Sequence, residues 1–240
     1  MKNFSKYDSI GSDYHYRQID KTRFRDFNAS VDARFGKLVE RVRSLVAGRD
    51  LKLLDVGCGD GVALYLLRDI PNLRLFGTDS SEKALRTAKE KVPDGEFEMS
   101  DTSSLPYKDE SFDVVISSDV IEHVEDPEKM LTEIKRVAKK EAYIIVGTPI
   151  RREKLPIDPQ HEQEFFKEDF SDMMSKFFSN IELHESHNLV PTLLYNAPTK
   201  NFINWRYAIN LASILGFNPF LSERKNGTQM FAYMYVICKK

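Results

Sequence analysis

The chain has 240 residues, of which 41% are hydrophobic, so it is long and apolar enough for one large domain with a substantial core. Its formal net charge is −2 and its pI is about 6.2, which argues against general binding to nucleic acid. Two cysteines, no apolar leader and no run of roughly 18 apolar residues predict a cytoplasmic protein without a disulfide framework or a membrane span.

The first two thirds of the chain alternate between predicted strands and helices. Residues 1–30 are polar and aromatic and predict an arm or a cover over a site, and residues 31–47 carry apolar side chains at helical spacing. Strands are then expected at 51–56, 73–79, 95–101, 112–119 and 142–149, and helices at 61–70, 80–92 and 127–140. Because the strands are almost continuously apolar and are separated by helices, the pattern predicts a parallel sheet covered on both faces.

The last third of the chain has a different pattern. A helix is expected at 167–178, a strand at 180–187, and a final strand within 227–240. Residues 190–226 hold three prolines and many aromatic residues without clear alternation, and predict a substrate lid inserted between the last two strands. Residues 201–221 are apolar at helical spacing and are interpreted as a lid helix packed on the domain. Contact with an apolar acceptor or with a membrane surface is the alternative.

The stretch LLDVGCGDG, residues 53–61, follows the first predicted strand directly. In open α/β sheets the ligand binds at the carboxyl ends of the strands, and glycine at the first turn lets the backbone approach it. A dinucleotide fingerprint G-x-G-x-x-G would need glycine at position 62, which is Val62. Asp79 ends the second strand, where an acid binds ribose hydroxyls, a feature that dinucleotides and nucleosides share.

Two further acids narrow the choice of ligand. Asp55 precedes the glycines, where it would repel a pyrophosphate but suits a ligand with a cationic or amino group. Asp101 ends the third strand, where it could accept a hydrogen bond from an adenine amino group. A cofactor that contains adenosine, lacks phosphate and carries positive charge is S-adenosylmethionine.

The motifs of residues 50–187 resemble those of class I S-adenosylmethionine-dependent methyltransferases. The stretch LLDVGCGDG resembles their first motif, LFGTDSSEKALRTAKEK their second, and residues 100–149 their third-to-fifth-strand region. The resemblance implies one domain over residues 1–240, with an α/β, Rossmann-like, doubly wound seven-stranded sheet. That sheet would be mostly parallel with an antiparallel last strand and helices on both faces. It also implies an enzyme that converts S-adenosylmethionine to S-adenosylhomocysteine.

The resemblance also implies which residues meet the cofactor. Asp55 would lie near the amino group, the glycines near the methionine and ribose parts, and Asp79 at the ribose hydroxyls. Helix capping and turn chemistry are the alternative explanation for Asp79 and Asp101. The implied cofactor-binding residues are Asp55, Gly57, Cys58, Gly59, Asp79, Ser80, Asp101, Thr102, Ser118 and Asp119.

A second group of chemically active residues lies in DVIEHVED, residues 119–126. If the chain turns helical there, Asp119, Glu122 and His123 share one face and could hold a divalent ion. The pattern resembles ubiquinone-biosynthesis O-methyltransferases and small-RNA 3′-end 2′-O-methyltransferases, and His161 stands where the RNA enzymes have a later histidine. We expect His123, His161 and Asp119 to act in catalysis. The alternative is that His123 only lines the substrate pocket and that His161 only forms a hydrogen bond within its loop. A metal held by Asp119, Glu122, His123 and His161 is the less favoured alternative.

These features leave three functions open. The first is methyl transfer to a small-molecule acceptor, at oxygen. The second is metal-dependent RNA 2′-O-methylation, which needs a basic groove, and residues 149–154 are the only compact basic stretch. The third is a catalytically silent S-adenosylmethionine-binding partner protein. The sequence does not identify the acceptor or the oligomeric state.

Overall fold

The computed structural model describes residues 7, 11–46, 48–152, 158–196, 204–225 and 231–240. Parts of the predicted arm, of the predicted lid and of the predicted final strand therefore lie outside the described residues.

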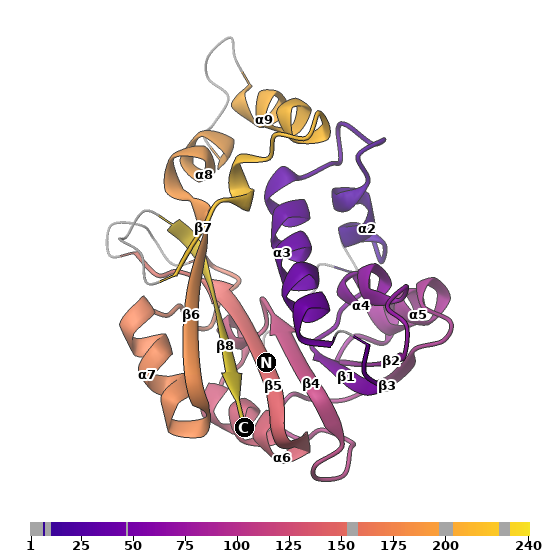
Figure 1. The fold of residues 1–240 in the computed structure, drawn as a ribbon. Coiled ribbons are helices and arrows are strands. Elements are labelled where there is room, and N and C mark those ends of the chain that lie inside the picture. Colours follow the sequence, from indigo (N-terminus) through magenta and orange to yellow (C-terminus); the bar gives the residue numbers. More distant parts are fainter. Residues whose placement is uncertain (1–6, 8–10, 47, 153–157, 197–203, 226–230) are drawn as a thin grey trace.

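One mixed sheet forms the centre of the molecule (Figure 1), with the strand order β3-β2-β1-β4-β5-β8-β6-β7. Strands β1 to β5 run parallel, and β8 lies antiparallel between β5 and β6. The strands are β1 Leu51–Val56, β2 Leu73–Asp79, β3 Glu96–Met99, β4 Phe112–Ser118, β5 Ala138–Pro149, β6 Ser179–Asn188, β7 Glu223–Lys225 and β8 Phe231–Lys239. The predicted doubly wound sheet of seven strands is confirmed. The edge strand β7 is an addition that no sequence pattern indicated.

Helices cover both faces of the sheet, as predicted (Figure 1). Side chains of α6 and α7 form one large apolar cluster with the sheet, and side chains of α3, α4 and α5 form the cluster on the other face. The helices are α2 Tyr14–Ile19, α3 Ala29–Val46, α4 Val62–Leu67, α5 Glu82–Lys91, α6 Pro127–Val137, α7 Lys167–Phe177, α8 Leu189–Asn196 and α9 Trp205–Ile214, with short 3₁₀ turns η1 Ile121–His123 and η2 Pro219–Leu221.

Local signals in the sequence explain where the helices around the sheet begin. The Ser81 hydroxyl accepts a hydrogen bond from the Ala84 backbone N–H and caps α5, and Asp126 caps α6 in the same way. In α6, Pro127 occupies the first turn, where its missing N–H costs nothing. The apolar side chains of α6 at positions 130, 131, 134 and 137 are all buried against the sheet, because this spacing places them on one face of the helix.

Helices α8 and α9 lie between β6 and β8 in the chain and stand at the top of the molecule in Figure 1. They form a small third cluster in which Phe27, Tyr195 and Phe220 are buried. Of the apolar side chains expected to pack a lid helix on the domain, Ile209 and Ile214 do so. Trp205, Tyr207, Leu211 and Leu215 are exposed, so that part of the prediction was wrong.

Candidate functional site

A cavity of about 1230 Å³ opens where β1, β2 and β4 end. Strand β1 is the point where the sheet reverses its order, because β2 and β3 lie on one side of it and β4 and β5 on the other. Ligands of open α/β sheets bind at this kind of position. The cavity extends from the glycine turn after β1 to the loop that carries His161.

The glycine turn forms one wall of the cavity, and two of its glycines are required by geometry. Gly57 adopts φ +76° and Gly59 φ +55°, in the left-handed region that side chains other than glycine rarely adopt. A Cβ atom on Gly57 would overlap the Val120 side chain, and one on Gly59 would overlap the Tyr7 hydroxyl. The backbone N–H groups of Gly57 and Cys58 both donate to the Thr78 carbonyl, at 2.8 Å each, which fixes the turn against β2.

Two carboxyl groups face the cavity beside this turn, that of the half-buried Asp79 and that of the buried Asp55. Asp79 accepts hydrogen bonds from the Gly59 and Ser81 backbone N–H groups, both at 2.8 Å, and burial raises its pKa. Asp55 is only 5% exposed, and within the described residues its carboxyl group has neither a hydrogen bond nor an ion pair. Burial, and then the charge of Asp79, raise the pKa of Asp55 to about 8. A cationic ligand group would therefore find an unpaired acid here.

Most of the predicted cofactor residues line this one cavity, namely Asp55, Gly57, Cys58, Gly59, Asp79, Ser80, Thr102, Ser118 and Asp119. Asp101 does not belong to the described lining. It is exposed, and its carboxylate accepts a hydrogen bond from the Ser103 backbone N–H at 2.8 Å, which is the turn chemistry considered as the alternative.

Several cavity residues come from the N-terminal part of the chain, where no motif pointed to them. Tyr7 and His15 line the cavity, and His15 is held by Asp60 through its backbone N–H and its Nδ1 atom, both at 3.0 Å. Arg34 on α3 reaches the cavity and donates to Asp119 at 2.7 Å. For Tyr7 and His15 the signal was the aromatic composition of residues 1–30, which predicted an arm or a cover, whereas nothing in the sequence indicated Arg34.

The chain after β4 does not meet the condition under which Asp119, Glu122 and His123 would share one helical face. It forms only the single 3₁₀ turn η1, and Asp119 precedes that turn with φ +57°. Asp119 therefore does not share a helical face with Glu122 and His123. Its carboxylate is instead held by Arg34 and by the Ser118 hydroxyl, the latter at 2.9 Å.

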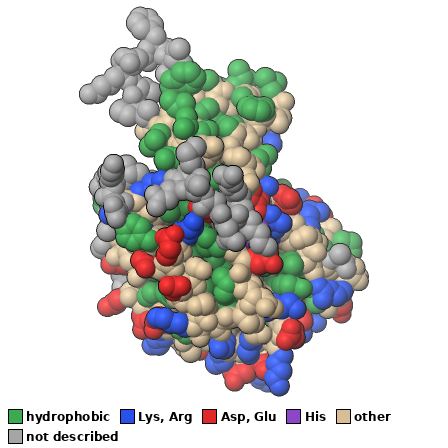
Figure 2. Space-filling model, turned by 60° about the vertical axis from the view of Figure 1, so that its left-hand side comes forward, with side chains coloured by type: hydrophobic (Ala, Val, Ile, Leu, Met, Phe, Trp, Pro, Cys, Tyr) green, Lys and Arg blue, Asp and Glu red, His purple; other side chains and the backbone are tan. Residues whose placement is uncertain are grey.

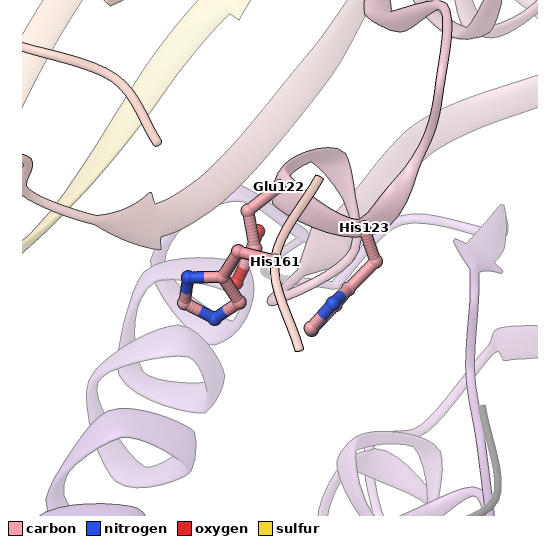
Figure 3. Close-up of side chains that lie close together, drawn as sticks. All are labelled: Glu122, His123 and His161. Atoms are coloured by element: carbon pink, nitrogen blue, oxygen red, sulfur yellow. The ribbon is translucent and has the colours of Figure 1, made fainter. Parts of the chain in front are cut away.

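Glu122, His123 and His161 do come together, with one potential ligand atom from each lying within 4.8 Å of the others (Figure 3). Glu122 and His123 belong to the turn after β4, and His161 comes from the loop before α7. Among the described residues the proposed metal set thus contains three members, without Asp119. Glu122 is buried, accepts a hydrogen bond from the Thr148 hydroxyl at 3.0 Å, and has a pKa raised to about 8 by burial and then by Asp119.

Both histidines of this cluster are oriented by a hydrogen bond at Nδ1. His161 Nδ1 lies 2.8 Å from a Glu164 carboxylate oxygen, and His123 Nδ1 lies 2.9 Å from the Gln160 carbonyl oxygen. Because a carboxylate only accepts hydrogen bonds, His161 donates from Nδ1, which leaves Nε2 as the ring nitrogen available to a ligand. A histidine arranged in this way can take a proton from a ligand.

Comparisons with known proteins agree with this geometry. Residues 54–146 match the model of a methyltransferase domain. The chain is 35% identical over 140 residues to a ubiquinone/menaquinone biosynthesis C-methyltransferase, UbiE, of Campylobacter jejuni, covering 55% of this chain and 58% of that one. It is 31% identical over 139 residues to a phosphatidylethanolamine N-methyltransferase of Cereibacter sphaeroides, covering 54% of this chain and 68% of that one. The chain belongs to the class I S-adenosylmethionine-dependent methyltransferases.

The likeness to solved structures supports the fold of this family. A methyltransferase structure from Thermotoga maritima superposes with a TM-score of 0.59 over 87% of this chain and 90% of that one, at 21% identity. The chain spans 58% of the length of the UbiE relative that it matches.

The cavity residues fit the cofactor of the family. The close backbone approach at Gly57 suits an uncharged adenosine. The acid that ends β2 suits the ribose hydroxyls, and the unpaired buried acid Asp55 suits an amino group. An ammonium beside Asp55 would also remove the cost of an unpaired charge in the apolar interior.

We predict that Asp55→Asn stabilises the ligand-free protein at alkaline pH. The pKa of Asp55 is about 8 in the folded state and about 4 in the unfolded state, so the folded state binds the proton more tightly. The protonated carboxyl group therefore contributes its full stabilisation below pH 4, and this stabilisation is lost as the pH rises towards 8. Asparagine does not titrate. The melting temperature of Asp55→Asn relative to the parent should therefore rise by at least about 4 °C between pH 5 and pH 8.

The same variant tests the amino group as the partner of Asp55. We expect its affinity for S-adenosylhomocysteine to fall about tenfold or more, through loss of a charge-assisted hydrogen bond. Affinity for 5′-methylthioadenosine, which lacks the amino acid part, should stay the same. Equal losses for both ligands would show that Asp55 does not bind the amino group.

Proposed function

We propose that the chain transfers a methyl group from S-adenosylmethionine to the oxygen of a small-molecule acceptor. The observation that carries this proposal is the His161–Glu164 pair on the cavity wall, with 2.8 Å between Nδ1 and the carboxylate oxygen. A hydroxyl acceptor must lose a proton as it is methylated, and a histidine oriented by a carboxylate is a suitable base.

The cofactor of the family, when bound, supplies a methyl group on a sulfonium that is already activated. The chain therefore has to hold the reactants in line and to remove a proton. Asp55, Asp79 and the glycine turn would hold the cofactor, and Nε2 of His161 would accept the hydroxyl proton. Asp119, fixed by Arg34, would border the reacting groups. Segments 1–30 and 190–226 would select the acceptor, which agrees with Tyr7, His15 and Asn196 lying on the cavity wall.

A metal-assisted form of the same reaction is the second candidate. The closeness of Glu122, His123 and His161 favours it, because two imidazoles and one carboxylate are a common ligand set for divalent transition metals. A bound cation would help the acceptor hydroxyl to ionise and would hold Glu122 in its charged form.

An RNA acceptor has less support. In the stretch 149–154, Arg151 pairs with Glu164 at 3.5 Å and Arg152 donates to the Phe231 carbonyl, while residues 153 and 154 lie outside the described residues. Acidic side chains prevail over basic ones on the described wall of the cavity. We therefore favour a small molecule over a polyanion.

We place this activity in the cytoplasm. Both cysteines, Cys58 and Cys238, are buried free thiols, which suits a reducing compartment. None of the helices in the described part of the chain combines the length and the apolar character that crossing a bilayer requires.

The first experiment is thermal unfolding with S-adenosylhomocysteine, with NAD as the control ligand. Ligand at 100 times its dissociation constant should add about 2.7 kcal/mol, which corresponds to a rise of roughly 5–10 °C. The protein is then incubated with S-adenosylmethionine and a panel of catechols, phenolic acids and amines, with chelator or with Mg²⁺, Mn²⁺ or Zn²⁺. We expect an O-methylated product whose yield is the same with and without chelator.

Each other result points to a different function. Loss of product under chelator would support the metal-assisted candidate, and N-methylated product would exclude oxygen as the acceptor atom. Binding of S-adenosylhomocysteine without methylation of any member of the panel, and without methylation of RNA tested in the same way, would favour the catalytically silent partner protein.

A further inference from the structure

Exposed apolar side chains are concentrated on the part of the molecule formed by α8, α9 and η2. We call residues 189–196 and 204–221 the tip. Among the described residues, nine of the twelve large hydrophobic side chains that are exposed belong to it, and Leu215 and Phe217 are 77% and 74% exposed. Figure 2 shows these hydrophobic side chains gathered at the top of the molecule, where α8 and α9 project in Figure 1. A cluster of this kind marks an interaction surface.

Helix α9 buries two polar side chains and exposes several large apolar ones, although Ile209 and Ile214 pack against the third cluster. Tyr207, Leu211 and Leu215 follow one another at intervals of four residues and are exposed, whereas Asn210 and Ser213 are buried. The buried Asn210 is fully engaged: it accepts from the Tyr195 hydroxyl and donates to the Phe27 carbonyl, both at 2.7 Å. This polar contact fixes the orientation of α9, so that Trp205, Tyr207 and Leu211 are exposed. A helix that faced water would have the opposite arrangement.

The charge around the tip is positive. The chain contains 37 acidic residues, yet none occurs between Asn188 and Ser222, where Lys200 and Arg206 are the only charged residues. Arg206 lies on α9, and Lys200 lies outside the described residues.

The loop of residues 20–28 adds to this charge, because Phe24 stacks on Tyr207 with 5.5 Å between the ring centroids. It contributes the exposed Arg23 and Arg25 beside its two acids, Asp20 and Asp26, of which Asp20 pairs with Arg23.

We propose that the tip binds the surface of an anionic lipid bilayer. A projecting apolar surface can enter the boundary between headgroups and acyl chains, while the neighbouring arginines meet anionic headgroups. The exposed rings of Trp205 and Tyr207 are of the type that settles at this boundary. Asn196, at the end of α8, lines the cavity, so the bilayer would border the entrance to the site. This inference does not depend on the proposed reaction.

The chain carries a built-in probe for this proposal, because Trp205 is its only tryptophan and lies on the tip. The full chain is titrated with vesicles of phosphatidylcholine alone or with added phosphatidylglycerol, and the Trp205 emission and the pelleted fraction are recorded. We expect a blue shift and pelleting with the anionic vesicles, both weakened by salt. The double variant Leu211→Ser/Leu215→Ser should bind at least tenfold more weakly. Met99→Ser is the matched control, because Met99 on β3 is an equally exposed apolar side chain away from the tip.

Three results would overturn the proposal. The first is absence of pelleting by the parent with anionic vesicles. The second is equal binding by the double variant and the parent. The third is a blue shift of the Trp205 emission when the protein is concentrated without vesicles, together with an increase in its mass in solution. If Leu211→Ser/Leu215→Ser abolishes both changes, the partner of the tip is a second copy of the chain. The melting temperature with S-adenosylhomocysteine shows independently whether the variants are folded and whether the cofactor site is intact.

Discussion

Gly57→Ala is expected to abolish cofactor binding while Gly48→Ala does not. At Gly57 the new methyl group would overlap the Val120 side chain, and Val120 leads into the turn that carries Glu122 and His123. Relief of this overlap requires either the glycine turn or the loop after β4 to move, and both line the cavity. We expect the affinity for S-adenosylhomocysteine to fall by at least about 100-fold, because a displacement of about 1 Å at a site can have this effect. Isothermal titration with the purified variant measures it.

Gly48 is a matched control for the backbone. It adopts φ +73°, close to the φ of +76° at Gly57, but a Cβ there would meet nothing within 4 Å. Gly48→Ala should therefore cost only the strain of a left-handed alanine, about 1–2 kcal/mol, and leave the cofactor affinity unchanged. If both variants lose affinity equally, backbone strain rather than contact with Val120 accounts for the effect.

His161→Ala is expected to lower kcat about 10²- to 10⁴-fold with the hydroxyl acceptor identified in the panel, since it removes the base. Glu164→Gln should have a smaller effect, because glutamine keeps an oxygen for His161 Nδ1 but lacks the charge that stabilises the protonated ring. The affinity for S-adenosylhomocysteine should be unchanged in both variants, because the cofactor would be held by Asp55, Asp79 and the glycine turn. Initial rates of S-adenosylhomocysteine release give kcat.

A second histidine–carboxylate pair provides the control for this prediction. His184 Nδ1 lies 2.7 Å from Glu223, and this pair does not belong to the described lining of the cavity. His184→Gln should leave kcat unchanged even if it lowers the melting temperature. Added imidazole should restore part of the activity of His161→Ala, which a purely structural role would not allow. Activity of His161→Ala within about threefold of the parent would exclude His161 as the base.

Signals that depend on neighbouring residues in the chain were sufficient to predict the order in which strands and helices follow one another from 51 to 149. Continuous apolar runs marked the strands, and the bounds of β1 and β2 agree with the predicted 51–56 and 73–79. The glycines after β1 and the acid that ends β2 indicated where the cavity lies, because parallel strands bring their carboxyl ends to one edge of the sheet. The helical turn that would have placed Asp119 beside Glu122 and His123 does not form, and Asp119 is held instead by Arg34, 85 residues away in the sequence.

Contacts between distant segments could be decided only by the tertiary structure. The sequence named His161 and Glu122 as candidates, but their position beside each other depends on how the loop before α7 packs against the turn η1, where the Glu162 backbone N–H donates to the Glu122 carbonyl. It had no means of placing Tyr7, His15 and Arg34 in the cavity, because they follow no motif. The periodicity of residues 201–221 predicted a helix, but only packing decides which side of that helix is buried. Hydrogen bonds of Asn210 to the core orient α9 so that Trp205, Tyr207 and Leu211 are exposed, whereas composition alone would have placed them inside.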